Sequence, residues 1–217
     1  MARGDRYDVS SLPEAQFEPG FRGRVLRNLQ GIRAVRDMAR TESEMLLVAT
    51  QRAIDQTRRD QRFSAAHICE LHRLWLGTIY AWAGEYRAVN VAKGDFMFAA
   101  AAQVPRLMRE LERGALRVYT PCQFTSSPEQ ARALAVVHAE LILIHPFREG
   151  NGRCARLLAM LMGLQAGLPP LDFSGIRGQE KQRYIGAIHA GLDRDYDPMT
   201  AIFGRIIART LRGVRRG

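Results

Sequence analysis

Two apolar helical segments joined by a short glycine-containing turn constrain the fold of this chain more than any other feature. The first segment opens at Ser127, which can cap a helix, with Pro128 in the first turn and Gln130 completing a capping box. We expect this helix to run to His145. The second starts near Asn151 and has a buried face at helical spacing, formed by Leu157, Leu158, Leu161, Met162 and Leu164.

Helical patterning also covers much of the remaining chain. It predicts helices over residues 21–31, 37–58, 178–192 and 197–212. Ser64 can cap a further helix that runs to about Tyr80. The apolar face of that helix consists of Ile68, Leu71, Leu74, Trp75 and Ile79.

A single β-hairpin is expected among these helices. Residues 88–92 and 96–99 favour strands and flank a turn at Lys93, Gly94 and Asp95. Because an isolated hairpin is only marginally stable, it must pack against the helices. The predicted fold class is therefore all-α, a helical bundle with one hairpin.

Length and composition favour one compact domain. A chain of 217 residues with 47% hydrophobic residues is long enough for one core and short for two. We expect residues 61–217 to form the main domain and residues 1–60 to supply an extension and helices that pack on it. Residues 1–20 are turn-rich and are expected to follow the surface.

Charge and cysteine content limit the classes of partner. The net charge is +10, but no basic motif is interleaved with aromatic residues, so direct binding to nucleic acid is not favoured. Cys69, Cys122 and Cys154 are widely spaced, which argues for a reducing cytoplasm and against a zinc site. The most apolar run, residues 131–144, is too short to span a bilayer, so no membrane contact is expected.

The turn between the two helices has the composition of a phosphate-binding site. Gly150 and Gly152 let backbone N–H groups approach an anion, and the helix that starts near Asn151 directs its unpaired amides to the same place. Arg153 and Arg156 are three residues apart, so both can leave one face of the helix and grip phosphate oxygens.

Two more residues of this turn suit catalysis. Glu149 supplies a hard oxygen ligand for Mg²⁺ held by a carboxylate and substrate phosphates. His145 has an unperturbed pKa near the operating pH and can act as a general base. By contrast, an isolated histidine is usually structural, and this is the interpretation for His67, His72, His138 and His189. Arg148 is expected to be a solvated charge and Cys154 a packing residue.

Residues 145–156, His-Pro-Phe-Arg-Glu-Gly-Asn-Gly-Arg-Cys-Ala-Arg, resemble the signature of Fic proteins, His-Pro-Phe-x-(Asp/Glu)-Gly-Asn-Gly-Arg-x-x-Arg, at every specified position. The resemblance extends from about Arg62 to about Pro198. It implies a protein adenylyltransferase that moves AMP from ATP to a Ser, Thr or Tyr hydroxyl of a target protein, with Mg²⁺ or Mn²⁺ at Glu149. It also implies His145 as the catalytic base.

The same resemblance implies roles for further residues. The nucleotide site would include Phe147, Gly150, Asn151, Gly152, Arg153, Arg156 and Tyr184. As an apolar residue, Phe147 is also expected to anchor the loop in the core. The hairpin would be a flap that positions the target through Lys93, Gly94, Asp95, Phe96, Met97 and Phe98. Some relatives carry an asparagine eight residues after the tyrosine, where this chain has Leu192, so base selectivity stays open.

Alternative activities and restraints also follow from the resemblance. Doc kinases carry a lysine where this chain has Gly152, which disfavours a kinase. A different phosphate-linked donor and a catalytically silent binding module stay open. Ser10 to Glu14 and Thr125 to Glu129 only approach the inhibitory pattern (Ser/Thr)-x-x-x-Glu-(Gly/Asn). Inhibition of the activity is therefore expected to come from a small partner protein or from self-association.

Overall fold

The computed structural model describes residues 12–19 and 25–214. Its helices are α1 (Val35–Gln56), α2 (Ala65–Leu76), α3 (Val104–Leu111), α4 (Arg117–Tyr119), α5 (Ser127–Ile144), α6 (Asn151–Gln165), α7 (Gln179–Ala190) and α8 (Asp197–Val214). A π-helical turn, Glu112–Leu116, joins α3 to α4. Short 3-10 turns occupy Pro13–Ala15, Ala101–Gln103, Phe173–Gly175 and Gly191–Asp193. Strands β1 (Ala92–Lys93) and β2 (Phe96–Met97) form the hairpin.

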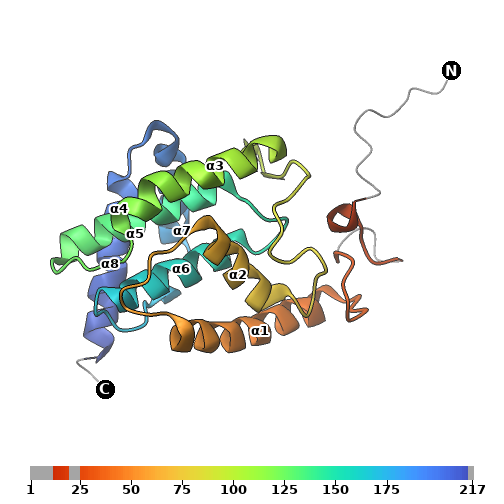
Figure 1. Cartoon of the computed structure of the whole chain (residues 1–217), viewed down its shortest axis with the longest axis horizontal. Helices are drawn as coiled ribbons and strands as arrows, with labels where there is room; N and C mark the ends of the chain where they lie inside the picture. The colour runs from red at the N-terminus through yellow and green to blue at the C-terminus, as the bar shows by residue number, and fades with distance from the viewer. Residues whose placement is uncertain (1–11, 20–24, 215–217) are drawn as a thin grey trace.

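Helix α5 lies at the centre of the bundle. It packs most extensively against α8 and α6, with α3 along another side, while α1 packs on α2 (Figure 1). Because α5 contacts helices on several sides, it is apolar nearly all round, and most of residues 131–144 are buried. The all-α class with one hairpin is confirmed.

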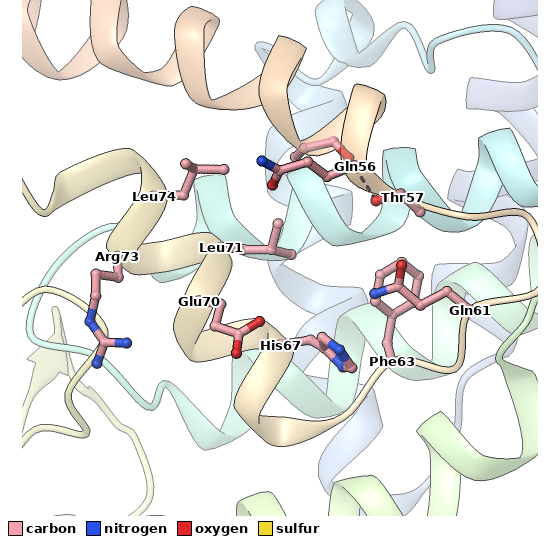
Figure 2. A pocket seen from close by; sticks show the side chains of 10 residues that line it. Gln56, Thr57, Gln61, Phe63, His67, Glu70, Leu71, Arg73 and Leu74 are labelled. Atoms are coloured by element: carbon pink, nitrogen blue, oxygen red, sulfur yellow. Dashed lines mark hydrogen bonds between the residues drawn. The ribbon is translucent and has the colours of Figure 1, made fainter.

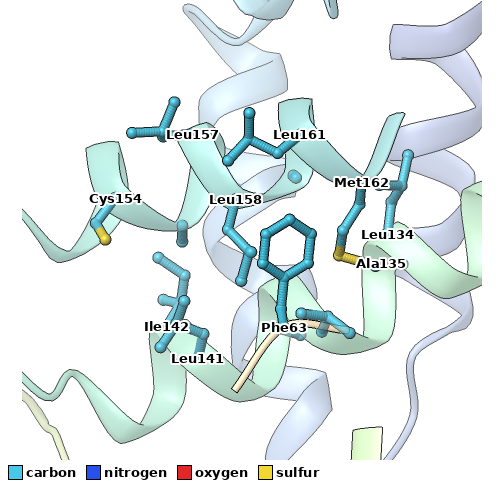
Figure 3. Close-up of a cluster of buried hydrophobic side chains, with 14 of the residues drawn as sticks. Phe63, Leu134, Ala135, Leu141, Ile142, Cys154, Leu157, Leu158, Leu161 and Met162 are labelled. Atoms are coloured by element: carbon cyan, nitrogen blue, oxygen red, sulfur yellow. The ribbon is translucent and has the colours of Figure 1, made fainter. Parts of the chain in front are cut away.

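The main core lies between α5 and α6. Phe63, from the segment that precedes α2, inserts its ring between these helices beside Leu158 and Met162 (Figure 3). Leu134 and Leu141 of α5 complete the same cluster, and all of these side chains are less than 5% exposed. This packing fixes the two helices that flank the signature relative to each other.

The predicted N-cap residue is correct for α2 and wrong by one residue for α5. Ser64 caps α2 as predicted, and His67 returns a bond to the Ser64 backbone. The cap of α5, however, is Ser126 and not Ser127. The Ser126 hydroxyl bonds with Glu129, whereas Gln130 donates to the carbonyls of Phe124 and Ala166.

The predicted helix over residues 21–31 is wrong in its described part, residues 25–31. The Asn28 amide accepts from the N–H groups of Gln30 and Ile32 and donates to the carbonyls of Leu26 and Ile32. These local bonds satisfy the backbone in a turn and replace a helical ladder. The helices predicted over 37–58, 178–192 and 197–212 are confirmed as α1, α7 and α8, whereas α2 ends at Leu76, before Tyr80.

The hairpin is shorter than predicted. Lys93 pairs with Phe96 and Ala92 pairs with Met97, so the turn contains only Gly94 and Asp95. The Phe98 N–H still donates to the Val91 carbonyl at 3.2 Å, but Ala88 and Val89 do not join the hairpin, and their N–H groups donate to the Glu14 carboxylate at 2.6 and 3.0 Å. Within the described residues, no helix is long and apolar enough to cross a membrane.

Candidate active site

The signature forms the connection between α5 and α6. His145 ends α5 in the left-handed conformation, with φ of 51°. Gly150 precedes α6 with φ of 82°, and a Cβ there would lie 2.6 Å from the Trp75 ring. Position 150 therefore requires glycine both for its backbone conformation and for the close approach of Trp75.

Two hydrogen bonds from the Asn151 side chain hold the loop between His145 and Gly150. The Asn151 Oδ1 accepts from the Phe147 N–H, and the Asn151 Nδ2 donates to the Phe147 carbonyl, each at 2.8 Å. Phe147 is fully buried, as expected for a core anchor. Asn151 is therefore placed to shape the loop. The Arg153 N–H donates to the Gly150 carbonyl, so the N–H groups of Asn151 and Gly152 are those of the first turn of α6 that can meet an anion.

His72 supports the same loop from α2. Its Nδ1 accepts from the Gly84 N–H at 2.8 Å, so Nε2 carries the proton and donates to the Glu149 carbonyl at 3.0 Å. The ring stacks on Phe147 with centroids 3.8 Å apart. Burial lowers the pKa of His72 to about 4, which keeps it neutral. The structural interpretation of His72 is correct, but its contact with the signature was not predicted.

His145 is oriented as a proton acceptor. Its Nδ1 lies 3.1 Å from the Ile142 carbonyl, which can only accept, so Nδ1 carries the proton and Nε2 keeps its lone pair. Burial lowers the pKa of His145 to about 4; Arg87 and Lys93 lower it further, while Glu149 and the Ile142 hydrogen bond oppose the shift. The imidazole is therefore neutral at physiological pH.

Arg87 joins the hairpin to His145. It is 2% exposed, and its guanidinium donates to the backbone carbonyls of His145, Val89 and Ala99. Its backbone N–H also donates to the Pro146 carbonyl at 2.9 Å. One buried side chain thus joins both stems of the flap to the end of α5, a connection that sequence spacing does not indicate.

The hairpin packs against two histidines. The Phe98 ring stacks on His145, and the Phe96 ring stacks on His189 with centroids 4.4 Å apart. Met97, between them, is 62% exposed, and Lys93, Gly94 and Asp95 are exposed at the tip. The flap therefore combines an inner aromatic face with an exposed outer edge.

The two signature arginines have different partners. Arg153 contacts the Glu42 carboxylate at 2.8 Å and the Glu149 carboxylate at 3.3 Å. Arg156 instead donates through Nε to the Gly152 carbonyl at 3.2 Å. Both are partly exposed, so terminal guanidinium nitrogens can still meet a phosphate.

Tyr184 is held beside Arg156. The His138 Nδ1 lies 3.2 Å from the Ala155 carbonyl, so its Nε2 accepts from the Tyr184 hydroxyl at 2.6 Å. Burial raises the pKa of Tyr184 to about 12, against the opposing effect of Arg156. Leu192, in the turn Gly191–Asp193 that follows α7, is 61% exposed.

Glu149 fits a cation that also binds substrate phosphates. Its side chain is 46% exposed, and Oε1 accepts from the Gly150 N–H at 2.9 Å. Over the described part of the chain, no three His, Cys, Asp or Glu side chains form a metal-binding group. A single accessible carboxylate suits Mg²⁺, which binds through one or two carboxylates with phosphates and water.

The structure confirms the packing role predicted for Cys154 and corrects the prediction for Arg148. Cys154 is buried and packs as predicted, and the three cysteines are free thiols. Arg148 is not simply solvated, because its Nε donates to the Glu14 carbonyl at 3.0 Å.

A hollow of about 340 Å³ lies between α2 and the end of α1, lined by Gln56, His67 and Leu71 among others (Figure 2). It contains no signature residue and is not the candidate site.

A family model described as the Fic/DOC family matches residues 62–162. The chain belongs to the Fic/DOC family. It is 28% identical over 182 residues to the protein adenylyltransferase VbhT of Bartonella schoenbuchensis, covering 82% of this chain and 36% of that protein. The probable protein adenylyltransferase Fic of Salmonella typhimurium is 28% identical over 190 residues, covering 85% of this chain and 88% of that protein.

Relatives of this Fic protein differ in length, and the chain spans about a third of some. The protein adenylyltransferase Fic of Nematostella vectensis is 31% identical over 148 residues, which are 66% of this chain and 32% of that protein. The Fic domain of a putative cell filamentation protein from Bartonella quintana, solved with ADP, is 25% identical with a TM-score of 0.69, covering 88% of this chain and 92% of that one. The BepC protein of Bartonella tribocorum, solved with AMPPNP, is 24% identical with a TM-score of 0.71, covering 90% and 97%, and shares the fold.

Proposed function

We propose that this chain is a magnesium-dependent protein adenylyltransferase, which transfers AMP from ATP to a Ser, Thr or Tyr hydroxyl of a target protein. The observation that carries the proposal is the position of His145. Its neutral imidazole, with Nε2 as acceptor, stands at one end of a glycine turn whose other end is the N-terminus of a helix.

The proposed reaction is an in-line displacement at the α-phosphorus. His145 accepts the proton of the target hydroxyl through Nε2 while the hydroxyl oxygen bonds to the α-phosphorus. The bond from that phosphorus to the oxygen leading to the β-phosphate breaks, and pyrophosphate leaves. In the turn that Gly150 shapes, the backbone N–H groups of Asn151 and Gly152 stabilise the charge on phosphate oxygens, and Arg153 and Arg156 hold the β- and γ-phosphates.

Glu149 would hold Mg²⁺ or Mn²⁺, which supplies neutralisation of phosphate charge when bound. Phe147 and Tyr184 complete the proposed nucleotide site, Phe147 from the core and Tyr184 beside Arg156. The flap, Lys93 to Phe98, would pair its exposed edge with an extended segment of the target. The free thiols of Cys69, Cys122 and Cys154 suit a reducing compartment, so we place the activity in the cytoplasm.

One observation favours a second candidate, an enzyme of the same family with another phosphate-linked donor. Leu192 is exposed where some relatives carry an asparagine for adenine, so the base-binding end of the site has no such polar partner at this position. The phosphate chemistry would be the same. Competition of ATP transfer by GTP, UTP or CTP separates the two candidates.

The decisive experiment uses the full chain with Mg²⁺, a cell lysate and ATP labelled at the α- or the γ-phosphate. We expect a protein band labelled from α-labelled ATP only. Label from γ-labelled ATP would indicate a kinase. No label, together with tight binding of Mg²⁺-ATP, would indicate a silent binding module.

A further inference from the structure

The carboxylate of Glu42 reaches the candidate site from α1, outside the segment that matches the family model. Its side chain is 9% exposed, and Oε2 lies 2.8 Å from Nη1 of Arg153. The other carboxylate oxygen accepts from the Tyr80 hydroxyl at 2.8 Å. Both oxygens of this buried carboxylate therefore have a partner, and its charge is balanced by Arg153.

Trp75 holds the same pair from α2. Its indole N–H donates to the Glu42 backbone carbonyl at 2.8 Å, which ties α1 to α2 at this point. The Arg153 guanidinium carbon lies 4.5 Å from the Trp75 ring centroid, so the cation also rests on an aromatic face. Arg153 is thus fixed by a carboxylate from α1 and by a ring from α2. Both partners lie more than 70 residues before it in the sequence and meet it only in the folded chain.

The second contact of Arg153 is weaker and can be exchanged. Its Nη2 lies 3.3 Å from Glu149, a half-exposed carboxylate that also accepts from the Gly150 N–H. Glu42 uses Nη1, so Nη2 is the terminal nitrogen that can leave Glu149 for a phosphate oxygen. Glu42 is therefore the permanent partner of Arg153, and Glu149 is the partner that a phosphate can replace.

We propose that Glu42 is a positioning residue that holds Arg153 in place for the β- and γ-phosphates of the nucleotide. This inference rests on the proposed function, in which Arg153 binds the triphosphate. A free arginine loses side-chain entropy when it binds a ligand, whereas an arginine already ordered by the fold loses little. Glu42 therefore increases affinity for the triphosphate without touching it.

A glutamate paired with a signature arginine could instead inhibit the enzyme by blocking the nucleotide phosphates. The contacts of Glu42 argue against this inhibitory role. Arg156 contacts the Gly152 carbonyl, and no salt bridge to it occurs among the described residues. Glu42 binds one terminal nitrogen of Arg153 and comes from a buried position, so a nucleotide does not have to displace it. Positioning predicts lost activity on removal of the carboxylate, whereas restraint predicts gained activity.

The test compares Glu42→Gln with Glu44→Gln, a matched change at an exposed position of the same helix. Glutamine keeps the volume of Glu42 and an acceptor for Tyr80 but loses the charge that orders Arg153. We expect the Kd of Mg²⁺-ATP and the KM for ATP to rise about tenfold in Glu42→Gln. Affinity for AMP, which lacks the β- and γ-phosphates, should stay within about twofold, as should all values for Glu44→Gln.

Two further variants keep the result interpretable. In an Arg153→Ala background, Glu42→Gln should cause no additional loss of ATP affinity, because the residue it acts through is gone. If Glu42→Gln does not fold, Tyr80→Phe removes only the hydrogen bond to Oε1 and should weaken ATP binding in the same direction.

Each outcome has a distinct meaning. Equal losses for ATP and AMP, unchanged ATP affinity, or faster transfer by Glu42→Gln would each overturn the positioning role while wild-type activity still supports the proposed function. A wild-type protein that does not bind Mg²⁺-ATP would refute the proposed function and this inference together.

Discussion

The Phe98 ring lies flat against the His145 imidazole, with centroids 3.6 Å apart and planes inclined by 16°. The stack covers one face of the proposed base and leaves the in-plane Nε2 as the acceptor. It also removes water from the ring, and burial is the main cause that lowers the pKa of His145 to about 4. The hairpin thus contributes to the burial that keeps the His145 imidazole neutral.

The first prediction follows from this stack. In wild type, His145 is deprotonated above a pKa of about 4, so kcat/KM should fall only at acid pH near that value. Phe98→Ala exposes the imidazole, and the pKa should rise toward its ordinary 6.5. The acid limb of the pH profile should then move upward. Phe96→Ala, which loses a stack on His189 instead, is the control and should leave the limb in place.

The second prediction concerns the base itself. His145→Ala removes the proton acceptor but no phosphate contact, so AMP transfer should fall by about 10² to 10⁴. Binding of Mg²⁺-ATP, measured by calorimetry, should be unchanged. Transfer at the wild-type rate would show that another group accepts the proton.

The third prediction concerns the cation. Transfer should require Mg²⁺ or Mn²⁺ and stop in chelator, because the triphosphate charge needs neutralisation. Glu149→Ala should reduce the metal-dependent part of ATP affinity by about tenfold or more. Wild-type transfer in chelator would contradict the role of Glu149.

The elements around the signature could be predicted because their signals are local. The helix–turn–helix of residues 127–165 depends on apolar periodicity, on a proline after His145 and on glycine at position 150. The cap at Ser64 likewise depends on a residue three positions away. The helical segment 104–119 was not predicted, although Pro105 in its first turn is a helix-start signal like Pro128; its start has no side-chain cap, and Gly114 lies within its π-helical turn.

The supporting residues could not be predicted, because each acts across a long stretch of chain. His72 meets Glu149, Arg87 meets His145, and Glu42 meets Arg153 only after folding. No spacing or motif links such pairs, and a lone buried histidine or arginine in a sequence does not differ from a structural one. The signature predicts the residues of the proposed phosphate site, whereas the residues that support them can be identified only in the tertiary structure.

The fourth prediction concerns stability. Arg87 is buried and donates to four backbone carbonyls, and it forms no salt bridge within the described part of the chain. Arg87→Lys cannot reproduce this fork, and carbonyls left unsatisfied in the interior are costly. We expect the free energy of unfolding in urea to fall by about 3 kcal/mol. Arg113→Lys, at an exposed position, should change it by less than about 0.5 kcal/mol. Equal effects would exclude the proposed role of Arg87.

The fifth prediction is that no glutamate of the two near-inhibitory segments restrains this chain. The Glu14 carboxylate accepts from the N–H groups of Ala88 and Val89, and Glu129 accepts from the Ser126 hydroxyl, so neither is bound to Arg156. Glu14→Gly leaves two N–H groups at the flap stem without their acceptor and should slow self-labelling from α-labelled ATP. Glu129→Gly loses only part of a helix cap and should label within about twofold of wild type. A rise of tenfold or more in either variant would instead reveal an inhibitor within the chain, and would remove the need for the partner protein or self-association that we propose as the restraint.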